Sequence, residues 1–185
     1  MKEDASMDAA RQATLATCGE LGYDNFRRLS ESALERYAEA HAAGAEHLAE
    51  RLIAAGSRRG SWRAGLRAGL NDLGLFVLEE PLLAIGLLVE AQAAAEPVQA
   101  QRREMIKRLT RAVDSARREN ESRHSPPPIA AEFMVLAIEH SAVAALENGA
   151  PEAFAAAVPE LAYLTVAPFF GRSAALEDRA ALSHP

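Results

Sequence analysis

The side chains of this sequence that could bind a metal or act as a nucleophile do not occur in the patterns that such chemistry requires. The one Glu-x-x-His pair, Glu121 and His124, lies in a polar, proline-rich stretch. A metal site in a helical bundle needs two such pairs and further carboxylates on helices. Cys18 is the only cysteine, and neither it nor any serine has a motif such as G-x-S-x-G around it. We therefore expect no metal site, no cofactor and no enzymatic activity.

Polar residues inside otherwise apolar segments are better candidates for a binding site. Asn71, Glu90 and His140 each stand among apolar residues, and ligand pockets combine apolar walls with a few polar groups. A buried Glu90 would need a ligand or an arginine as its partner, because an unpaired buried carboxylate is costly. The alternative for each of the three is a packed core or surface position. We predict that they orient a ligand between apolar walls, which include Trp62, Phe76, Met105, Phe133 and Met134.

The composition indicates a helical protein with one core. The 185 residues are 49% hydrophobic but only 5% aromatic, and abundant Ala, Leu, Glu and Arg favour helices. No apolar stretch reaches membrane-spanning length without a charge, and the acidic start lacks the features of a secretory signal. A single cysteine gives no disulfide framework, so we expect a protein of the reducing cytoplasm.

Helical periodicity and helix boundary signals predict an all-α fold of about eight helices. Gly65 and Gly69 have a G-x-x-x-G spacing that indicates close packing of one helix on another. Pro159 should kink or break the last helix, because proline removes a backbone donor. The main predicted helices cover residues 8–21, 33–55, 62–79, 81–95, 98–118, 129–148 and 151–170, and a flexible tail covers 173–185.

Four segments carry a resemblance to a known family. They are "ATLATCGELGYD", "AEAHAAGAEHLAERL", "WRAGLRAGLNDLGLFVLEEPLLAIGLLVEA" and "VPELAYLTVAPFFG". In this order, with a Gly-Tyr stop after the first helix and a Pro-Phe-Phe-Gly end, they resemble the TetR/AcrR family of bacterial transcriptional regulators over residues 8–171. The resemblance implies a small N-terminal helix-turn-helix head that binds DNA and a larger C-terminal domain that senses a small molecule.

The resemblance also implies a homodimer, in which the last two helices pair with those of a second copy. Residues 129–148 and 151–170 are too apolar all round for surface helices of a monomer, which favours the same arrangement. A buried core position is the alternative for these helices. The expected interface residues are Leu136, Val143, Leu146, Leu161, Leu164 and Phe169.

The head departs from the family pattern. A helix-turn-helix needs about 20 residues by ordinary helix geometry, but only eight lie between Tyr23 and the predicted helix cap at Ser32. Tyr37 could be a remnant of the missing recognition helix, which would leave Arg27 and Arg28 as the candidate phosphate contacts. Residues 1–50 hold five basic and ten acidic side chains, a net charge of −5, and such a surface opposes binding to phosphates.

The basic segment 102–123 is a separate candidate for binding anions. It holds eight basic and four acidic side chains, a net charge of +4. A nucleic-acid or anionic-ligand role is conceivable, but a solvated helix face opposite Met105 and Leu109 is the favoured interpretation.

Taken together, the sequence predicts a TetR-like sensor in three parts. Residues 1–32 form a shortened head, residues 33–172 form the ligand-sensing and dimerisation domain, and residues 173–185 form the tail. The leading hypothesis is a regulator that senses a small molecule and has impaired or lost DNA binding. The alternative is a small-molecule-binding or heterodimerising helical protein that does not bind DNA.

Overall fold

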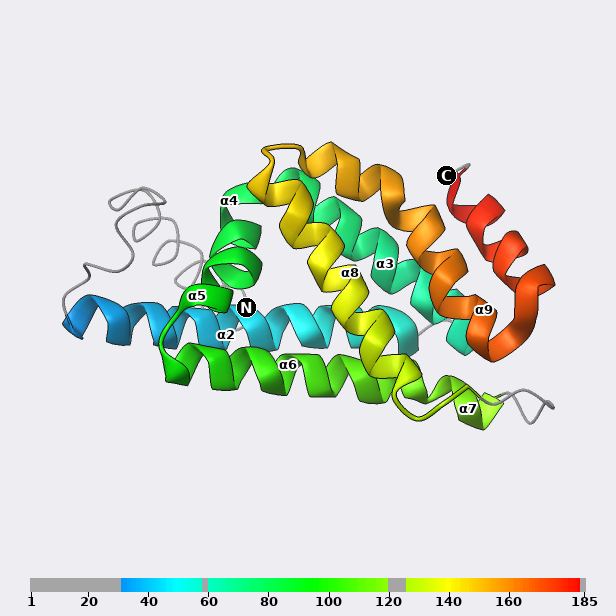
Figure 1. Ribbon diagram of the computed structural model, residues 1–185, viewed down its shortest axis with the longest axis horizontal. Coiled ribbons are helices and arrows are strands. Elements are labelled where there is room, and N and C mark those ends of the chain that lie inside the picture. The colour runs from blue at the N-terminus through cyan, green and yellow to red at the C-terminus, as the bar shows by residue number, and fades with distance from the viewer. Residues whose placement is uncertain (1–30, 58–59, 120–125, 184–185) are drawn as a thin grey trace.

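The computed structural model describes residues 31–57, 60–119 and 126–183, and over these residues the protein is all-helical, as predicted. Figure 1 shows the arrangement of the helices. In chain order they are α2 (Glu31–Ser57), α3 (Trp62–Glu79), α4 (Pro81–Ala84), the π-helical segment η2 (Ile85–Val89), α5 (Glu90–Ala93), α6 (Glu96–Asp114), α7 (Ala116–Glu119), α8 (Ala130–Glu147) and α9 (Pro151–Ser183).

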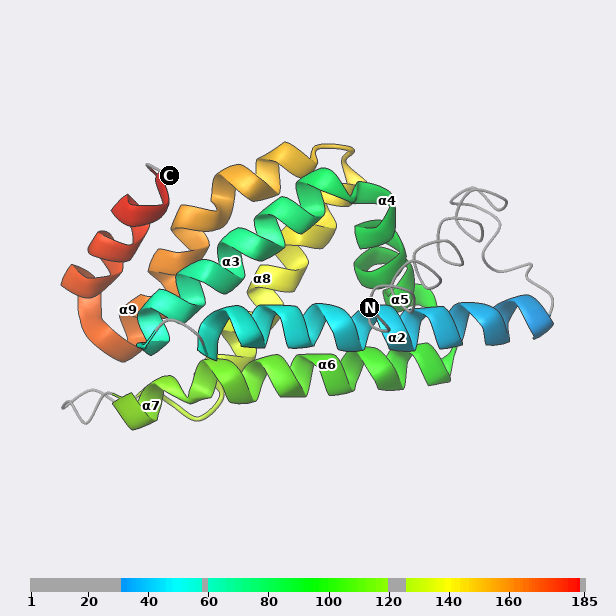
Figure 2. The ribbon, with the colours of Figure 1, turned by 180° about the vertical axis from the view of Figure 1, so that it is seen from behind.

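Five long helices close a ring around the protein's interior. Helix α2 packs on α3 and α6, α6 packs on α8, α8 on α9, and α9 back on α3. Figures 1 and 2 show α2 and α6 side by side along one edge, with α3, α8 and α9 above them. The largest hydrophobic cluster draws its side chains from this whole ring and from η2. The ring therefore encloses one shared interior.

Local sequence signals explain the bounds of α3. The Ser61 hydroxyl accepts a hydrogen bond from the Ala64 backbone N–H at 3.3 Å, which caps the helix start. Pro81 occupies the first turn of α4, where its missing N–H is harmless. A Cβ atom at Gly69 would lie 3.2 Å from the Leu52 carbonyl oxygen of α2. The close packing predicted from the G-x-x-x-G spacing is thus confirmed at Gly69, where α3 approaches the backbone of α2.

The C-terminal segment is helical and packed, so the prediction of a flexible tail over 173–185 was wrong as far as Ser183. Helix α9 continues to Ser183, with a bend at Gly171, whose backbone has φ 83° and ψ 171°. This positive φ favours glycine, and it turns the segment after residue 171 back along the ring (Figure 1). Pro159 lies within helix α9, and the non-helical backbone is at Gly171.

Helix α9 is also long and apolar enough to cross a membrane, judged by length and composition. Within the fold, 39% of its most apolar window is buried, and core helices of globular proteins meet the same criterion. Here α9 packs on α3 and α8 as part of the ring.

Candidate ligand-binding cavity

A cavity of about 790 Å³ lies inside the ring, between α2, α3, α6 and α8. This volume falls within the range of small-molecule sites. Its walls are mostly aliphatic because the inward rows of four helices meet there. They include Leu48 and Leu52 of α2, Leu70 of α3, Met105 and Leu109 of α6 and Ile138 of α8.

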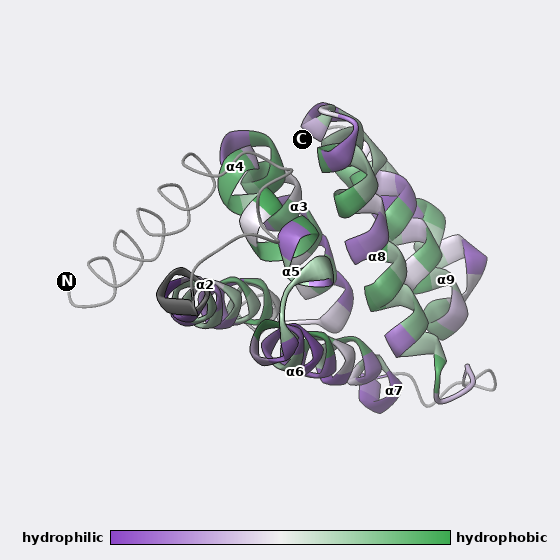
Figure 3. Cartoon of the chain, turned by 60° about the vertical axis from the view of Figure 1, so that its left-hand side comes forward, coloured by the Kyte–Doolittle hydropathy of each residue, from purple (hydrophilic) through white to green (hydrophobic). Residues whose placement is uncertain are grey.

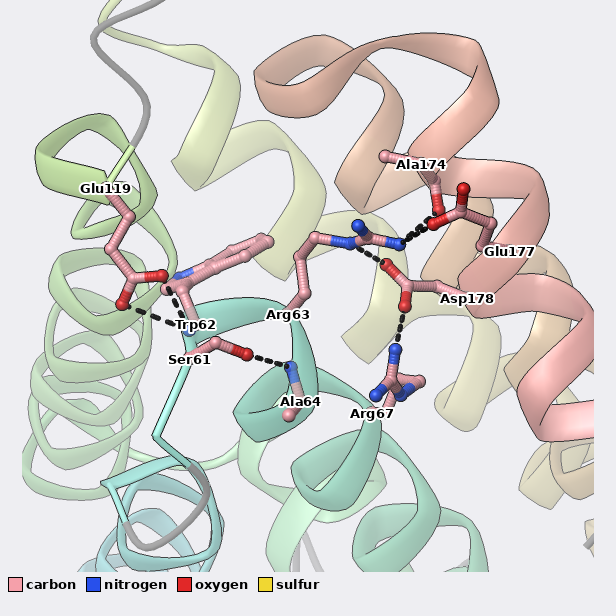
Figure 4. Close-up of polar contacts among 9 residues, drawn as sticks. All are labelled: Ser61, Trp62, Arg63, Ala64, Arg67, Glu119, Ala174, Glu177 and Asp178. Carbon is pink, nitrogen blue, oxygen red and sulfur yellow. Dashed lines mark hydrogen bonds and ion pairs between the residues drawn. The ribbon is translucent and has the colours of Figure 1, made fainter.

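Trp62 fixes the end of the cavity where α3 begins. Its indole Nε1 donates to the Ala112 carbonyl oxygen at 3.1 Å, and its ring stacks on Phe170 with centroids 5.4 Å apart. The Trp62 backbone N–H donates to both oxygens of Glu119, at 2.8 and 3.0 Å (Figure 4). These contacts join α3, α6, α7 and α9 around one residue, so the position of Trp62 depends on all four helices.

An acidic side chain in the cavity wall was missed by the sequence analysis. Glu139 of α8 is 7% exposed and lines the cavity. Arg102 of α6 holds it with two hydrogen bonds, of which the Nε to Oε1 bond is 2.7 Å. The reasoning applied to Glu90, that a buried carboxylate on an apolar helix needs an arginine partner, describes Glu139. The sequence signal was present, since Glu139 lies in the most apolar part of 129–148.

The predicted pocket residues divide into two groups. Trp62 and Met105 line the cavity. Phe76 is buried in the core outside the cavity wall. The other five predicted residues do not line the cavity; Glu90 and Met134 are half-buried, and Asn71, Phe133 and His140 are exposed.

The orientation of α3 and α8 explains why Asn71, Phe133 and His140 do not line the cavity. The inward row of α3 contains Leu66, Leu70 and Leu73, and Asn71 lies about 100° away from Leu70 around the helix. On α8 the inward residues include Val135 and Ile138, which leaves Phe133 and His140 on the opposite side. Both helices are apolar over most of their circumference, so hydrophobicity alone does not identify the inward face.

A buried polar cluster joins α2 to η2 beside the cavity. The Tyr37 hydroxyl donates to the Gly86 carbonyl oxygen at 2.7 Å. The two ring nitrogens of His41 lie 3.0 Å from Gln101 Oε1 and 3.2 Å from the Leu87 carbonyl oxygen. Burial lowers the pKa of His41, and its hydrogen bonds to Gln101 and Leu87 oppose that effect. A π-helical turn departs from the regular backbone hydrogen bonding of an α-helix. In η2, the carbonyl oxygens of Gly86 and Leu87 face the side chains of Tyr37 and His41 of α2.

The predicted dimer residues are also of two kinds. Leu136 and Leu164 are 39% and 54% exposed and could contact a second copy. The other four side chains pack inside their own chain and cannot form a surface; they are Val143, Leu146, Leu161 and Phe169.

The predicted head, residues 1–32, lies outside the described residues except for its last two residues, which begin α2. Arg27 and Arg28, the candidate phosphate contacts, belong to residues 1–30, and the structure does not test them. Tyr37 lies within α2 and is buried, with its hydroxyl bound to η2. Among the described side chains, no group of three or more His, Cys, Asp or Glu residues is placed to hold a metal ion.

The described residues thus form a ring of helices around an apolar space large enough for a small molecule. Comparison with protein-family models, with curated proteins and with solved structures gives no match. The resemblance to the TetR/AcrR family therefore depends on the sequence segments alone.

Proposed function

We propose that this protein is a TetR-like sensor that binds a small, largely apolar molecule in the cavity inside the ring. The observation that carries the proposal is the cavity of about 790 Å³, whose aliphatic wall includes part of α2, the helix that follows the shortened head. Leu48 and Leu52 of α2 line the cavity directly. A ligand that contacts these residues changes the packing of α2 on α3 and α6.

The polar cluster supports a route from the cavity to the first half of α2. Leu88 lines the cavity, and the carbonyl of the preceding Leu87 faces His41. A shift of η2 caused by a ligand at Leu88 therefore moves the contacts that hold Tyr37 and His41. In the family that this chain resembles, tilting of the corresponding helix changes the spacing of two DNA-binding heads. Such heads must match half-sites about one helical turn apart.

We propose further that DNA binding by this chain is impaired or lost, because the eight residues between Tyr23 and Ser32 are too few for a helix-turn-helix and residues 1–50 carry a net charge of −5. The alternative function is a ligand-binding partner that pairs with a full-length relative and never contacts DNA. An exposed apolar row on α8 favours a role in pairing of either kind, since such rows mark interaction surfaces. It consists of Phe133 and Leu136 together with Ile129, the residue that precedes the helix.

Intrinsic fluorescence provides a direct test of ligand binding, because Trp62 is the only tryptophan and it lines the cavity. Titration of the full chain with 1-alkanols of increasing length should change the Trp62 emission in a saturable way. Each added methylene should tighten binding by about 0.8 kcal/mol until the cavity is full. Absence of any saturable change across the series would overturn the proposed function.

Two matched variants separate cavity binding from surface binding. Ala112→Phe places a large side chain in the cavity wall, whereas Ala100→Phe adds the same group on the exposed face of the same helix. We expect the first variant to weaken alkanol binding at least about tenfold and the second to leave it unchanged.

A gel shift with the DNA upstream of the protein's own gene, across a salt series, tests the head. A steep salt slope would contradict impaired DNA binding.

A further inference from the structure

The part of the cavity wall formed by α6 and α7 carries a row of three arginines and a serine along one side. Arg108, Arg111, Ser115 and Arg118 all line the cavity. Their spacings of three, four and three residues place them on one side of a helical segment. The same segment contributes Met105 and Leu109 to the apolar wall. A ligand in the cavity thus meets an aliphatic interior and a basic edge.

The two acidic side chains of the wall are already bound by near neighbours. Glu119 accepts from the Trp62 backbone N–H with both oxygens, at 2.8 and 3.0 Å. Glu139 is held by Arg102. Each of these carboxylates therefore already has a hydrogen-bond donor within the chain.

The arginines of the row are held much less firmly. Arg108 lies 3.6 and 3.9 Å from the carboxylates of Glu46 and Glu50, and the Arg111 guanidinium lies 3.5 Å from Glu104. All three glutamates are exposed and lie outside the cavity wall. Arg118 has no ion pair among the residues that the structure describes. Long ion pairs at a surface contribute little, so an arriving anion can replace them.

We infer that the ligand is an amphipathic anion, an aliphatic body with one negatively charged head group such as a carboxylate. The body fills the apolar part of the cavity, and the head lies against Arg111 and Arg118. This inference rests on the proposed function, since it names the chemistry of the molecule bound in the same cavity. It also gives arginines of the basic segment 102–123 a role in ligand binding, whereas the sequence analysis favoured a solvated helix face for this segment.

A matched pair of ligands tests the head group separately from the body. Decanoate and 1-decanol have the same chain length and differ in charge, so both should change Trp62 fluorescence, and decanoate should bind about fivefold more tightly at low salt and neutral pH. The double variant Arg111→Gln, Arg118→Gln should remove this preference and leave 1-decanol binding unchanged. Arg103→Gln, an exposed position of α6 outside the cavity wall, is the control and should keep the preference.

The outcomes separate the two proposals. If neither ligand binds, the proposed function fails and the inference fails with it. If both bind equally, or if the double variant keeps the preference for decanoate, the cavity is a binding site but the basic edge does not select an anion. A preference that falls as salt rises from about 0.02 M to about 0.5 M, and that only the double variant loses, supports the inference.

Discussion

At the scale of single residues, His41 shows how a buried polar side chain can have a structural role inside an apolar stripe. The sequence places it at a helical position shared with Leu48 and Leu52, and the structure buries it fully. Its ring nitrogens face Gln101 Oε1 and the Leu87 carbonyl oxygen, and a neutral imidazole can donate to only one of them. His41 therefore contributes specificity to the packing of α2 on α6 and η2 through polar contacts that a leucine could not make.

The lowered pKa of His41 predicts a pH dependence of stability. Burial places the pKa below the ordinary value of 6.5, so the unfolded chain takes up a proton at a higher pH than the folded one. The contribution of His41 to the free energy of unfolding is constant above about pH 6.5, and it is lost as the pH falls toward the folded-state pKa. The slope is at most about 1.4 kcal/mol per pH unit.

Urea unfolding at pH 7.5, 6.5 and 5.5 measures this effect, with His41→Gln as the comparison. The native chain should lose stability between pH 6.5 and 5.5, and the variant should lose less. Equal losses in both proteins would assign the pH dependence to other groups.

At the scale of elements, the sequence was sufficient to predict the bounds of a helix where local signals mark its ends. The bounds predicted for 62–79 match α3, and those for 129–148 match α8 within a residue, because Ser61 and Pro81 mark the first and Gly149 follows the second. Local signals could not show the π-helical turn inside 81–95, whose carbonyls are bound by side chains 46 to 49 residues away. Such long-range contacts leave no periodic pattern.

The cavity was predicted less well than the helices. Trp62 and Met105 line the cavity, but the inward faces of α3 and α8 could not be distinguished from their outward faces in the sequence. On α8, for example, Phe133 is 64% exposed although phenylalanine usually lies inside. An apolar row on each side of a helix gives the same composition whether the helix faces a cavity, the core or a partner.

The helical segment after Gly171 provides an element-scale prediction. The buried Asp178 accepts from Arg63 Nε at 2.7 Å and is also bound by Arg67, and both arginines belong to α3 (Figure 4). The Asp178 carboxylate raises the pKa of Arg63. Asp178→Asn removes the negative charge that both guanidinium groups face, and it should lower the free energy of unfolding by about 2 kcal/mol.

The matched control is Glu177→Gln, because Glu177 also contacts Arg63 but is largely exposed. It should change the free energy of unfolding by less than about 1 kcal/mol. Limited proteolysis should cleave the C-terminal segment faster in Asp178→Asn than in either the control or the native chain. If the two variants were equally stable, the clamp of this segment on α3 would not depend on the buried carboxylate.

At the scale of the whole molecule, the exposed apolar side chains of the last two long helices predict a dimer. Figure 3 shows α8 and α9 together on one flank, with hydrophobic residues along both. Phe133 and Leu164, on α8 and α9 respectively, are 64% and 54% exposed. Sedimentation velocity of the native chain at micromolar concentration should show a dimer, because pairing of two copies through this flank would remove these side chains from water.

The variant Phe133→Glu, Leu164→Glu tests this surface directly, since two buried carboxylates on each copy would oppose association. It should sediment as a monomer while its circular dichroism stays helical, because both positions are exposed in the single chain. Leu82→Glu introduces the same change at an exposed leucine of α4 and should remain dimeric. A native chain that is monomeric at micromolar concentration, or a double variant that is still dimeric, would exclude α8 and α9 as the self-association surface. A monomeric native chain would direct attention to a different partner for this apolar flank.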